Sequence, residues 1–215
     1  MSADTAGNRG PDSPAGRFGA RMAARPSATS LQTRLVKKEL ETLHAVYESL
    51  EADQTVARAA ATVVGARRRF VIGAGRSAAF ALLLDVDLSL GVSQVTLIDG
   101  LIIRPSDVLT DVRATDVLIA FSMRRYRREI VQFVEQFVER GGTVVAITDS
   151  PDSPLMPFAK DAIVVSTASE SVTDTATPVA AVIHLLAALT TASAKGARRR
   201  LQEREIISSE MGFYA

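Results

Sequence analysis

The sequence predicts a doubly wound, three-layer αβα fold around a parallel sheet. Short runs of continuous apolar residues alternate with longer segments in which apolar residues recur every three or four positions. In the short runs, apolar residues do not alternate with polar ones, as they would in a strand with one solvent-exposed face. Such continuous apolar runs are typical of parallel strands covered by helices on both sides. With 215 residues, 47% of them apolar, the chain can fill one sizeable core.

The elements are expected in a regular order. Two helices precede the sheet, and Ser30 is the expected N-cap of the first. The helices are expected over residues 31–50 and 54–65. The five strands are expected over residues 70–72, 94–98, 116–121, 143–147 and 162–165. Helices between and after them are expected over residues 77–90, 126–140 and 175–194, with short helical stretches after Pro105 and over 153–159.

Composition excludes several classes of function. The formal net charge of +1 gives no global attraction to nucleic acid or to an anionic membrane. The chain has no cysteine, and its two histidines, His44 and His184, lie far apart, so we expect no metal site and no cofactor. Residues 1–30 have no periodic apolar face and are expected to be a disordered tail before a single domain over 31–215. No apolar run reaches membrane-spanning length and no leader pattern is present, so we expect a cytoplasmic protein.

A glycine-rich turn after the first expected strand predicts an anion-binding site. The strand runs into Gly73-Ala74-Gly75-Arg76-Ser77, and a helical pattern follows at once. Glycines in such a turn permit positive φ angles and let a ligand approach the backbone. The N–H groups of the first helical turn, with the positive end of the helix dipole, attract a phosphate or a carboxylate.

Polar residues follow two further strands, at Ser122-Met123-Arg124-Arg125-Tyr126 and Thr148-Asp149-Ser150. Because the carboxyl ends of parallel strands meet at one edge of the sheet, we expect the three loops to converge on one crevice. Serine hydroxyls there can hydrogen-bond a phosphate, and arginine guanidinium groups match its oxygens in pairs. Arg127 and Arg128 are expected to point outward or to pair with Glu129. The predicted ligand-binding residues are Gly73, Gly75, Arg76, Ser77, Ser122, Arg124, Arg125, Tyr126, Thr148 and Ser150.

The same glycine turn also permits a competing interpretation as a dinucleotide site. Residues 73–78 fit the fingerprint in its form ending in alanine, and Asp99 lies about where a ribose-binding acid would be. Against this interpretation, the chain has no second domain to hold a hydride donor or acceptor. An arginine beside a serine also suits a terminal phosphate better than a bridging pyrophosphate.

Three segments of the chain carry a family resemblance: residues 70–77, the run DVLIAFSMRRYRRE over 116–129, and residues 145–150 followed by Ser153-Pro154-Leu155. Together they resemble the sugar isomerase (SIS) domain, most closely the effector domain of MurR/RpiR-type transcriptional regulators. The resemblance covers residue 31 to the end of the last long helix, and Phe-Ser-x-Arg-Arg-Tyr is its most specific part.

The resemblance implies a five-stranded flavodoxin-like sandwich that binds phosphosugars as a dimer or higher oligomer. It places the family's first-loop serine on Ser77 and its leading second-loop serine on Ser122. The common pattern Ser-x-Ser-Gly-x-Thr would put hydroxyl groups where this chain has Arg124 and Arg127. The regulators also carry a helix-turn-helix domain, and the segment before residue 31 is too short and too polar to form one. We therefore expect direct DNA binding only with a partner.

Three classes of function are compatible with these residues. A non-catalytic sensor of a sugar phosphate, acting in the regulation of carbohydrate metabolism, is favoured by the arginine-rich second loop and by the lack of an evident acid/base pair. A phosphosugar isomerase is the alternative; it needs groups that move a proton between adjacent carbons, and Glu170 and His184 are its candidates. A DNA-binding regulator would use the basic residues within 195–200, but the glutamates that follow favour an ordinary charged helix.

Overall fold

The computed structural model of the chain describes residues 15–18 and 27–213. At its centre is a sheet in which all neighbouring strands are parallel, in the order β2-β1-β3-β4-β5. The strands are β1 (Arg68–Gly73), β2 (Val95–Ile98), β3 (Asp116–Ser122), β4 (Thr143–Thr148) and β5 (Asp161–Val164). The predicted five-stranded parallel sheet of flavodoxin-like topology is confirmed.

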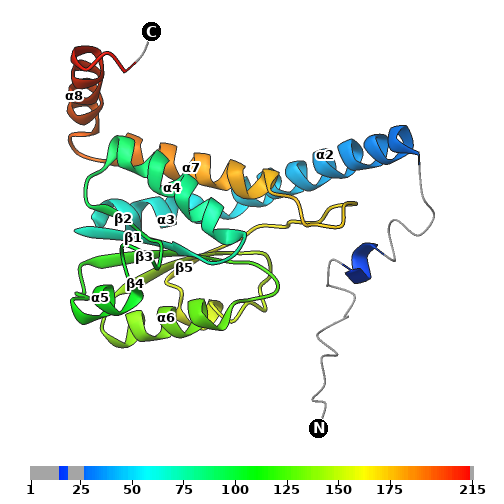
Figure 1. Cartoon of the computed structure of the whole chain (residues 1–215), viewed down its shortest axis with the longest axis horizontal. Helices are drawn as coiled ribbons and strands as arrows, with labels where there is room; N and C mark the ends of the chain where they lie inside the picture. The colour runs from blue at the N-terminus through cyan, green and yellow to red at the C-terminus, as the bar shows by residue number, and fades with distance from the viewer. Residues whose placement is uncertain (1–14, 19–26, 214–215) are drawn as a thin grey trace.

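Helices cover both faces of this sheet (Figure 1). One layer contains α3 (Thr55–Gly65), α4 (Ser77–Gly91) and α7 (Thr177–Ser193), and the other contains α5 (Pro105–Thr110), α6 (Arg128–Glu139) and the 3-10 turn η1 (Met156–Phe158). The central strand β3 is buried along its whole length. Its side chains alternate between the layers, because Ile119 and Phe121 join the α3/α4/α7 core while Leu118 and Ala120 join the α5/α6 core. Both faces of the central strand are therefore covered by apolar cores, as expected.

The first long helix, α2 (Ala28–Asp53), begins three residues earlier than expected. The side-chain oxygen of Ser27 accepts a hydrogen bond from the backbone N–H of Ser30 at 3.2 Å. Ser27 has the extended backbone of an N-cap, so the prediction of Ser30 as the cap was wrong. One end of α2 packs on the body through Thr42 and Val46, and the other end extends beyond the sheet (Figure 1).

A buried arginine joins the start of β1 to its neighbours. The guanidinium of Arg69 donates to the carbonyl oxygens of Val63, Val64 and Ser93 at 2.8 to 3.0 Å. The first two are at the end of α3, where carbonyl groups lack helical partners, and the third precedes β2. Burial lowers the pKa of Arg69 from its usual value. This side chain thus anchors α3 and the approach to β2 against the first strand.

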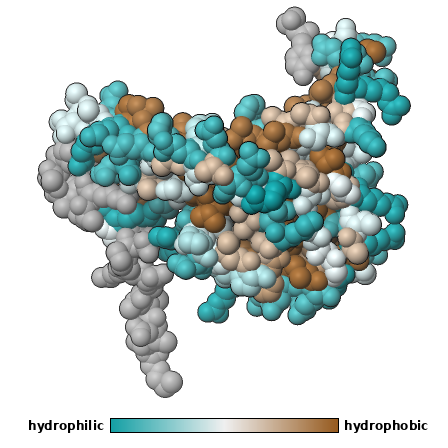
Figure 2. All heavy atoms as spheres, turned by 180° about the vertical axis from the view of Figure 1, so that it is seen from behind, coloured by the Kyte–Doolittle hydropathy of each residue, from teal (hydrophilic) through white to brown (hydrophobic). Residues whose placement is uncertain are grey.

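The last helix, α8 (Ala197–Glu210), projects from the sandwich (Figures 1 and 2), and Arg200 on its first turn donates to the carbonyl oxygen of Ser89 on α4 at 3.2 Å. Ala197 is its only buried residue, so the expected charged helix is present but packs no broad apolar face on the body. Within the described residues, no single helix is both long and apolar enough to span a membrane; only α7 and α8 taken together, bent by 105°, pass by length and composition. The same residues include no group of three or more His, Asp or Glu side chains arranged to hold a metal ion.

The expected disordered tail over 1–30 falls mainly on residues 1–14 and 19–26, which are outside the described residues. Two parts of it are described. Residues 15–18 form a short helical segment, and residues 28–30 belong to α2. The structured part of the chain therefore extends to the N-terminal side of the expected boundary at residue 31.

Candidate functional site

The junction between β1 and α4 forms the first wall of the candidate site. Gly73 ends β1, Gly75 has a positive φ of 59°, and α4 begins at Ser77. A Cβ atom at Gly73 would lie 2.3 Å from the carbonyl oxygen of Ser77, so only glycine allows the helix to start this close to the strand. The Ser77 side chain is buried at this junction. Gly73 therefore positions the turn rather than lining the space beyond it.

The loop after β3 forms the opposite wall, and Asp149 supports it from behind. The Asp149 carboxylate accepts hydrogen bonds from the backbone N–H of Arg124 at 3.2 Å and from the Tyr126 hydroxyl at 3.0 Å. Burial, and then the charge of Asp149, raises the pKa of Tyr126 above its usual value. These hydrogen bonds hold the loop in a non-helical conformation. Helix α6 therefore begins at Arg128, two residues after the expected start at Tyr126.

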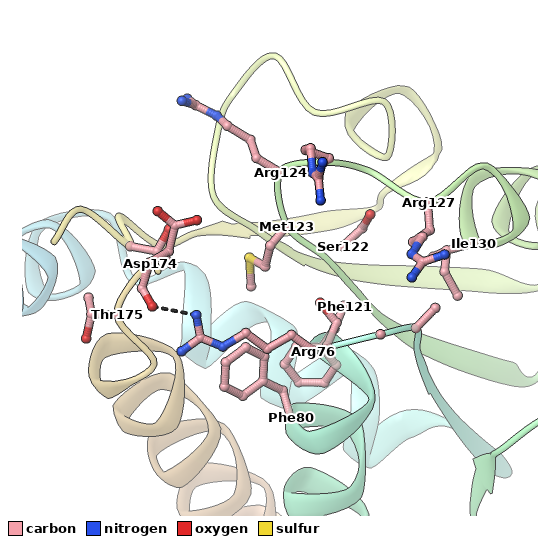
Figure 3. Close-up of a pocket in the computed structure, with 15 residues that line it drawn as sticks. Arg76, Phe80, Phe121, Ser122, Met123, Arg124, Arg127, Ile130, Asp174 and Thr175 are labelled. Atoms are coloured by element: carbon pink, nitrogen blue, oxygen red, sulfur yellow. Dashed lines mark hydrogen bonds between the residues drawn. The ribbon is translucent and has the colours of Figure 1, made fainter. Parts of the chain in front are cut away.

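A cavity of about 200 Å³ lies between the two walls, at the carboxyl edge of the sheet (Figure 3). Phe80 and Phe121, with ring centroids 6.3 Å apart, form an apolar base in this view. Six of the ten predicted ligand-binding residues line the cavity: Gly75, Arg76, Ser77, Ser122, Arg124 and Arg125. Two of the three predicted loops thus converge on one crevice.

The third predicted loop lies behind the cavity. The Thr148 hydroxyl is buried and donates to the carbonyl oxygen of Ser122 at 2.7 Å, which ties the ends of β3 and β4 together. The Ser150 hydroxyl accepts a hydrogen bond from the backbone N–H of Asp152. Gly73, Tyr126 and Thr148 therefore support the two walls, Ser150 bonds within its own turn, and none of the four is among the residues that line the cavity. A direct ligand contact by any of the four stays a prediction.

The two isomerase candidates also lie outside the cavity lining. His184 is exposed on α7, and Glu170 is half-buried in the segment between β5 and α7. The one acidic residue among the residues that line the cavity is Asp174, from the same segment. Sequence reasoning missed Thr167, Asp174 and Thr175 because this segment carries neither the strand nor the helix pattern that located the other loops.

Four arginines line the cavity, and they differ in their contacts. Arg76 reaches across the opening and donates from its Nη1 atom to the backbone carbonyl of Asp174 at 2.5 Å. Arg127 approaches Gly75, with its Nη2 atom 3.3 Å from where a Cβ would lie, and Figure 3 shows its guanidinium turned toward the cavity. Its expected pairing with Glu129 is present, with 3.8 Å between Nη1 and Oε1, yet Arg127 also lines the cavity. Arg124 points away from the other labelled side chains, and its Nε atom lies 3.6 Å from Asp149.

The structure argues against the dinucleotide interpretation through Asp99. One oxygen of its carboxylate accepts hydrogen bonds from the backbone N–H groups of residues 101, 102 and 103 at 2.9 to 3.0 Å. These bonds lower the pKa of Asp99. The carboxylate closes the turn after β2, so it is engaged by its own loop rather than presented to a ribose.

The SIS domain family model matches residues 63–189, which include all five strands. The chain belongs to the SIS domain family. Comparison with curated protein sequences gives no match.

Several solved structures share this fold. The sugar isomerase domain of an RpiR transcription factor from Sphaerobacter thermophilus is 27% identical, with a TM-score of 0.72 over 82% of this chain and 97% of that chain. The NanR protein of Vibrio vulnificus, complexed with ManNAc-6P, is 14% identical, with a TM-score of 0.70 over 90% of this chain and 73% of that chain. A protein of E. coli CFT073, solved as a ligand complex, is 20% identical, with a TM-score of 0.57 over 75% of this chain and 90% of that chain. The resemblance seen in the sequence, to SIS domains of the MurR/RpiR type, is confirmed.

The close contact at Gly73 predicts a sharp difference between two glycine substitutions. Gly73→Ala should lower the free energy of unfolding by about 1 to 3 kcal/mol, because its methyl group meets backbone that cannot rotate away. Gly65→Ala is the matched control, since a Cβ there has no other atom within 4 Å. Urea unfolding followed by circular dichroism measures both. Equal stability of the two variants would contradict the close contact.

Proposed function

We propose that this SIS domain binds a sugar phosphate without converting it and acts as a sensor module of the MurR/RpiR type in carbohydrate metabolism. The observation that carries the proposal is the cavity lined both by two buried serines, from the β1–α4 turn and the end of β3, and by four arginines. Hydroxyl and guanidinium groups donate hydrogen bonds, so they suit a ligand that has many acceptor oxygens and few donors of its own. A phosphate group is such a ligand.

The phosphate would lie between Ser77 and Ser122, at the N-terminus of α4. There the dipole of a 15-residue helix adds to the hydroxyl donors. The guanidinium of Arg127 lies beside Gly75, in the turn that leads into α4. It would neutralise the negative charge of the phosphate, at a position where the family usually has a hydroxyl residue. The apolar base formed by Phe80 and Phe121 would support the carbon skeleton of the sugar.

The placement of the acid/base candidates supports a non-catalytic role. Aldose–ketose isomerisation needs a base within hydrogen-bond reach of the proton that moves. Glu170 and His184 do not line the cavity, and the Asp174 carboxylate is held in an ion pair by Arg17. An isomerase is the second candidate, because Asp174 is a carboxylate at the cavity and a ligand that released it from Arg17 would leave it able to accept a proton.

A ligand screen with product analysis separates the two candidates. The protein is mixed with a panel of sugar phosphates that includes ManNAc-6P and common hexose and pentose phosphates, and its melting temperature is measured. A ligand at one hundred times its Kd should raise the melting temperature by about 5 to 10 °C. Recovery of that ligand unchanged after incubation supports the sensor. Recovery of its aldose or ketose partner, lost in Asp174→Asn, would replace the sensor with an isomerase.

Ser122 provides a more local test of the phosphate position. Ser122→Ala should weaken binding of the best ligand by about 1 to 3 kcal/mol, because the phosphate loses a buried donor. Ser106→Ala on α5 is the control, since that serine is exposed and lies outside the cavity lining. Calorimetric titration measures both variants. Unchanged affinity in Ser122→Ala would remove this residue from the site.

A homodimer or higher oligomer is the second part of the proposal, with DNA contact only through a partner. Helix α4 leaves Leu82 and Val86 51% and 53% exposed, and α2 leaves Leu40 64% exposed. These exposed apolar residues make α4 and α2 the candidate helices for the interface between subunits. Light scattering at micromolar concentration should show at least a dimer, which Leu82→Glu with Val86→Glu dissociates. Leu101→Glu with Ile102→Glu, in an exposed loop, is the control, and a monomeric wild type would contradict the proposal.

A further inference from the structure

The acidic residue of the cavity lining, Asp174, also contacts the N-terminal segment. Arg17, in the helical segment 15–18, donates from its Nη1 atom to the Asp174 carboxylate across 157 positions of sequence. The side chains of Arg17 and Asp174 are 14% and 28% exposed, so the pair is largely withdrawn from water. A residue from far outside the matched SIS region therefore reaches the wall of the cavity.

The segment that carries Asp174 makes three further hydrogen bonds, one on the cavity side and two with α2. On the cavity side, the Asp174 carbonyl accepts the hydrogen bond from Arg76. On the other side, the Thr175 hydroxyl donates to Glu39 of α2 at 2.6 Å, and the Thr42 hydroxyl of α2 donates to the carbonyl of Ala168 at 3.1 Å. The segment is thus held between the ligand cavity and the chain that precedes the sheet.

Charge gives the Arg17 contact a role in binding. A carboxylate at the wall of a cavity that takes a phosphate repels the ligand, because both carry negative charge. Arg17 neutralises this carboxylate and brings one more positive charge close to the cavity. An anionic ligand in turn raises the local negative potential and holds the guanidinium more firmly.

We infer that Arg17 is a positioning residue of the ligand site, and that docking of segment 15–18 on Asp174 and binding of the sugar phosphate favour each other. This inference rests on the proposed function, because it needs an anionic ligand in the cavity. The coupling is reciprocal: whatever factor docking adds to ligand affinity, the ligand adds to docking. The N-terminal segment would then report the occupancy of the cavity to whatever it contacts.

A double-mutant cycle on the full chain tests the coupling. The probe is the sugar phosphate that gives the largest thermal shift, titrated by calorimetry. Arg17→Ala should weaken its binding about three- to tenfold, because Asp174 is left with its charge less neutralised. Asp174→Asn in the same chain should restore affinity, since it removes the repelling charge. Arg34→Ala, an exposed arginine of α2, is the matched control and should change nothing. Loss of affinity without rescue, or no loss at all, would overturn the inference.

Trypsin gives a second measurement, and its first comparison needs no ligand. Trypsin cleaves the bond after Arg17 only when the Arg17 side chain enters the specificity pocket of the protease. Pairing of Arg17 with Asp174 should therefore protect this bond. Intact-mass analysis should show faster cleavage after Arg17 in Asp174→Asn than in wild type, and slower cleavage in wild type when the sugar phosphate is added. Equal cleavage rates in all three samples would overturn the docking. If no sugar phosphate binds, the proposed function fails, while the ligand-free comparison still decides whether Arg17 docks on Asp174.

Discussion

The contact between Gly73 and the start of α4 is the constraint on which the candidate site depends. A parallel sheet brings its strand ends to one edge, but the distance between a strand end and the next helix is set by the side chains between them. With no Cβ at Gly73, the Ser77 carbonyl comes to 2.3 Å from where that atom would be, and α4 starts immediately beyond β1. The Ser77 side chain and the helix N-terminus are thereby brought against the cavity.

The opposite wall is fixed by polar contacts rather than by a helix. Asp149 holds the loop after β3 through Arg124 and Tyr126, and Thr148 ties the ends of β3 and β4. These polar groups are paired with each other, so hydrogen bonds rather than helical structure hold the irregular loop in place. The cavity thus lies between a wall set by the close contact at Gly73 and a wall held by hydrogen bonds.

The sheet and the first two loops could be predicted from sequence because their signals are local. Continuous apolar runs indicate buried parallel strands, and Gly73-Ala74-Gly75 and Ser122 come directly after them. The N-cap of α2 was misplaced because Ser27 and Ser30 are equally suitable residue types, and only the backbone conformation separates them. The start of α6 was misplaced because Tyr126 is turned toward Asp149 and so ends in the loop.

The rest of the site depends on contacts between distant residues, which no local pattern records. Asp174 reaches the cavity from an irregular segment, and Arg17 reaches Asp174 from a stretch whose composition favours disorder. Arg127 was expected to point outward or to pair with Glu129; it does pair with Glu129, and the missing side chain at Gly75 also lets it turn toward the cavity. In each case a residue's role depends on what the fold places opposite it.

A crystal structure of the complex with the best sugar phosphate would show where the phosphate group binds. Phosphate oxygens are expected within about 3.2 Å of the Ser77 and Ser122 hydroxyl oxygens, at the N-terminus of α4. A phosphate bound elsewhere on the molecule, or bound in the cavity without contact to either serine, would contradict this expectation.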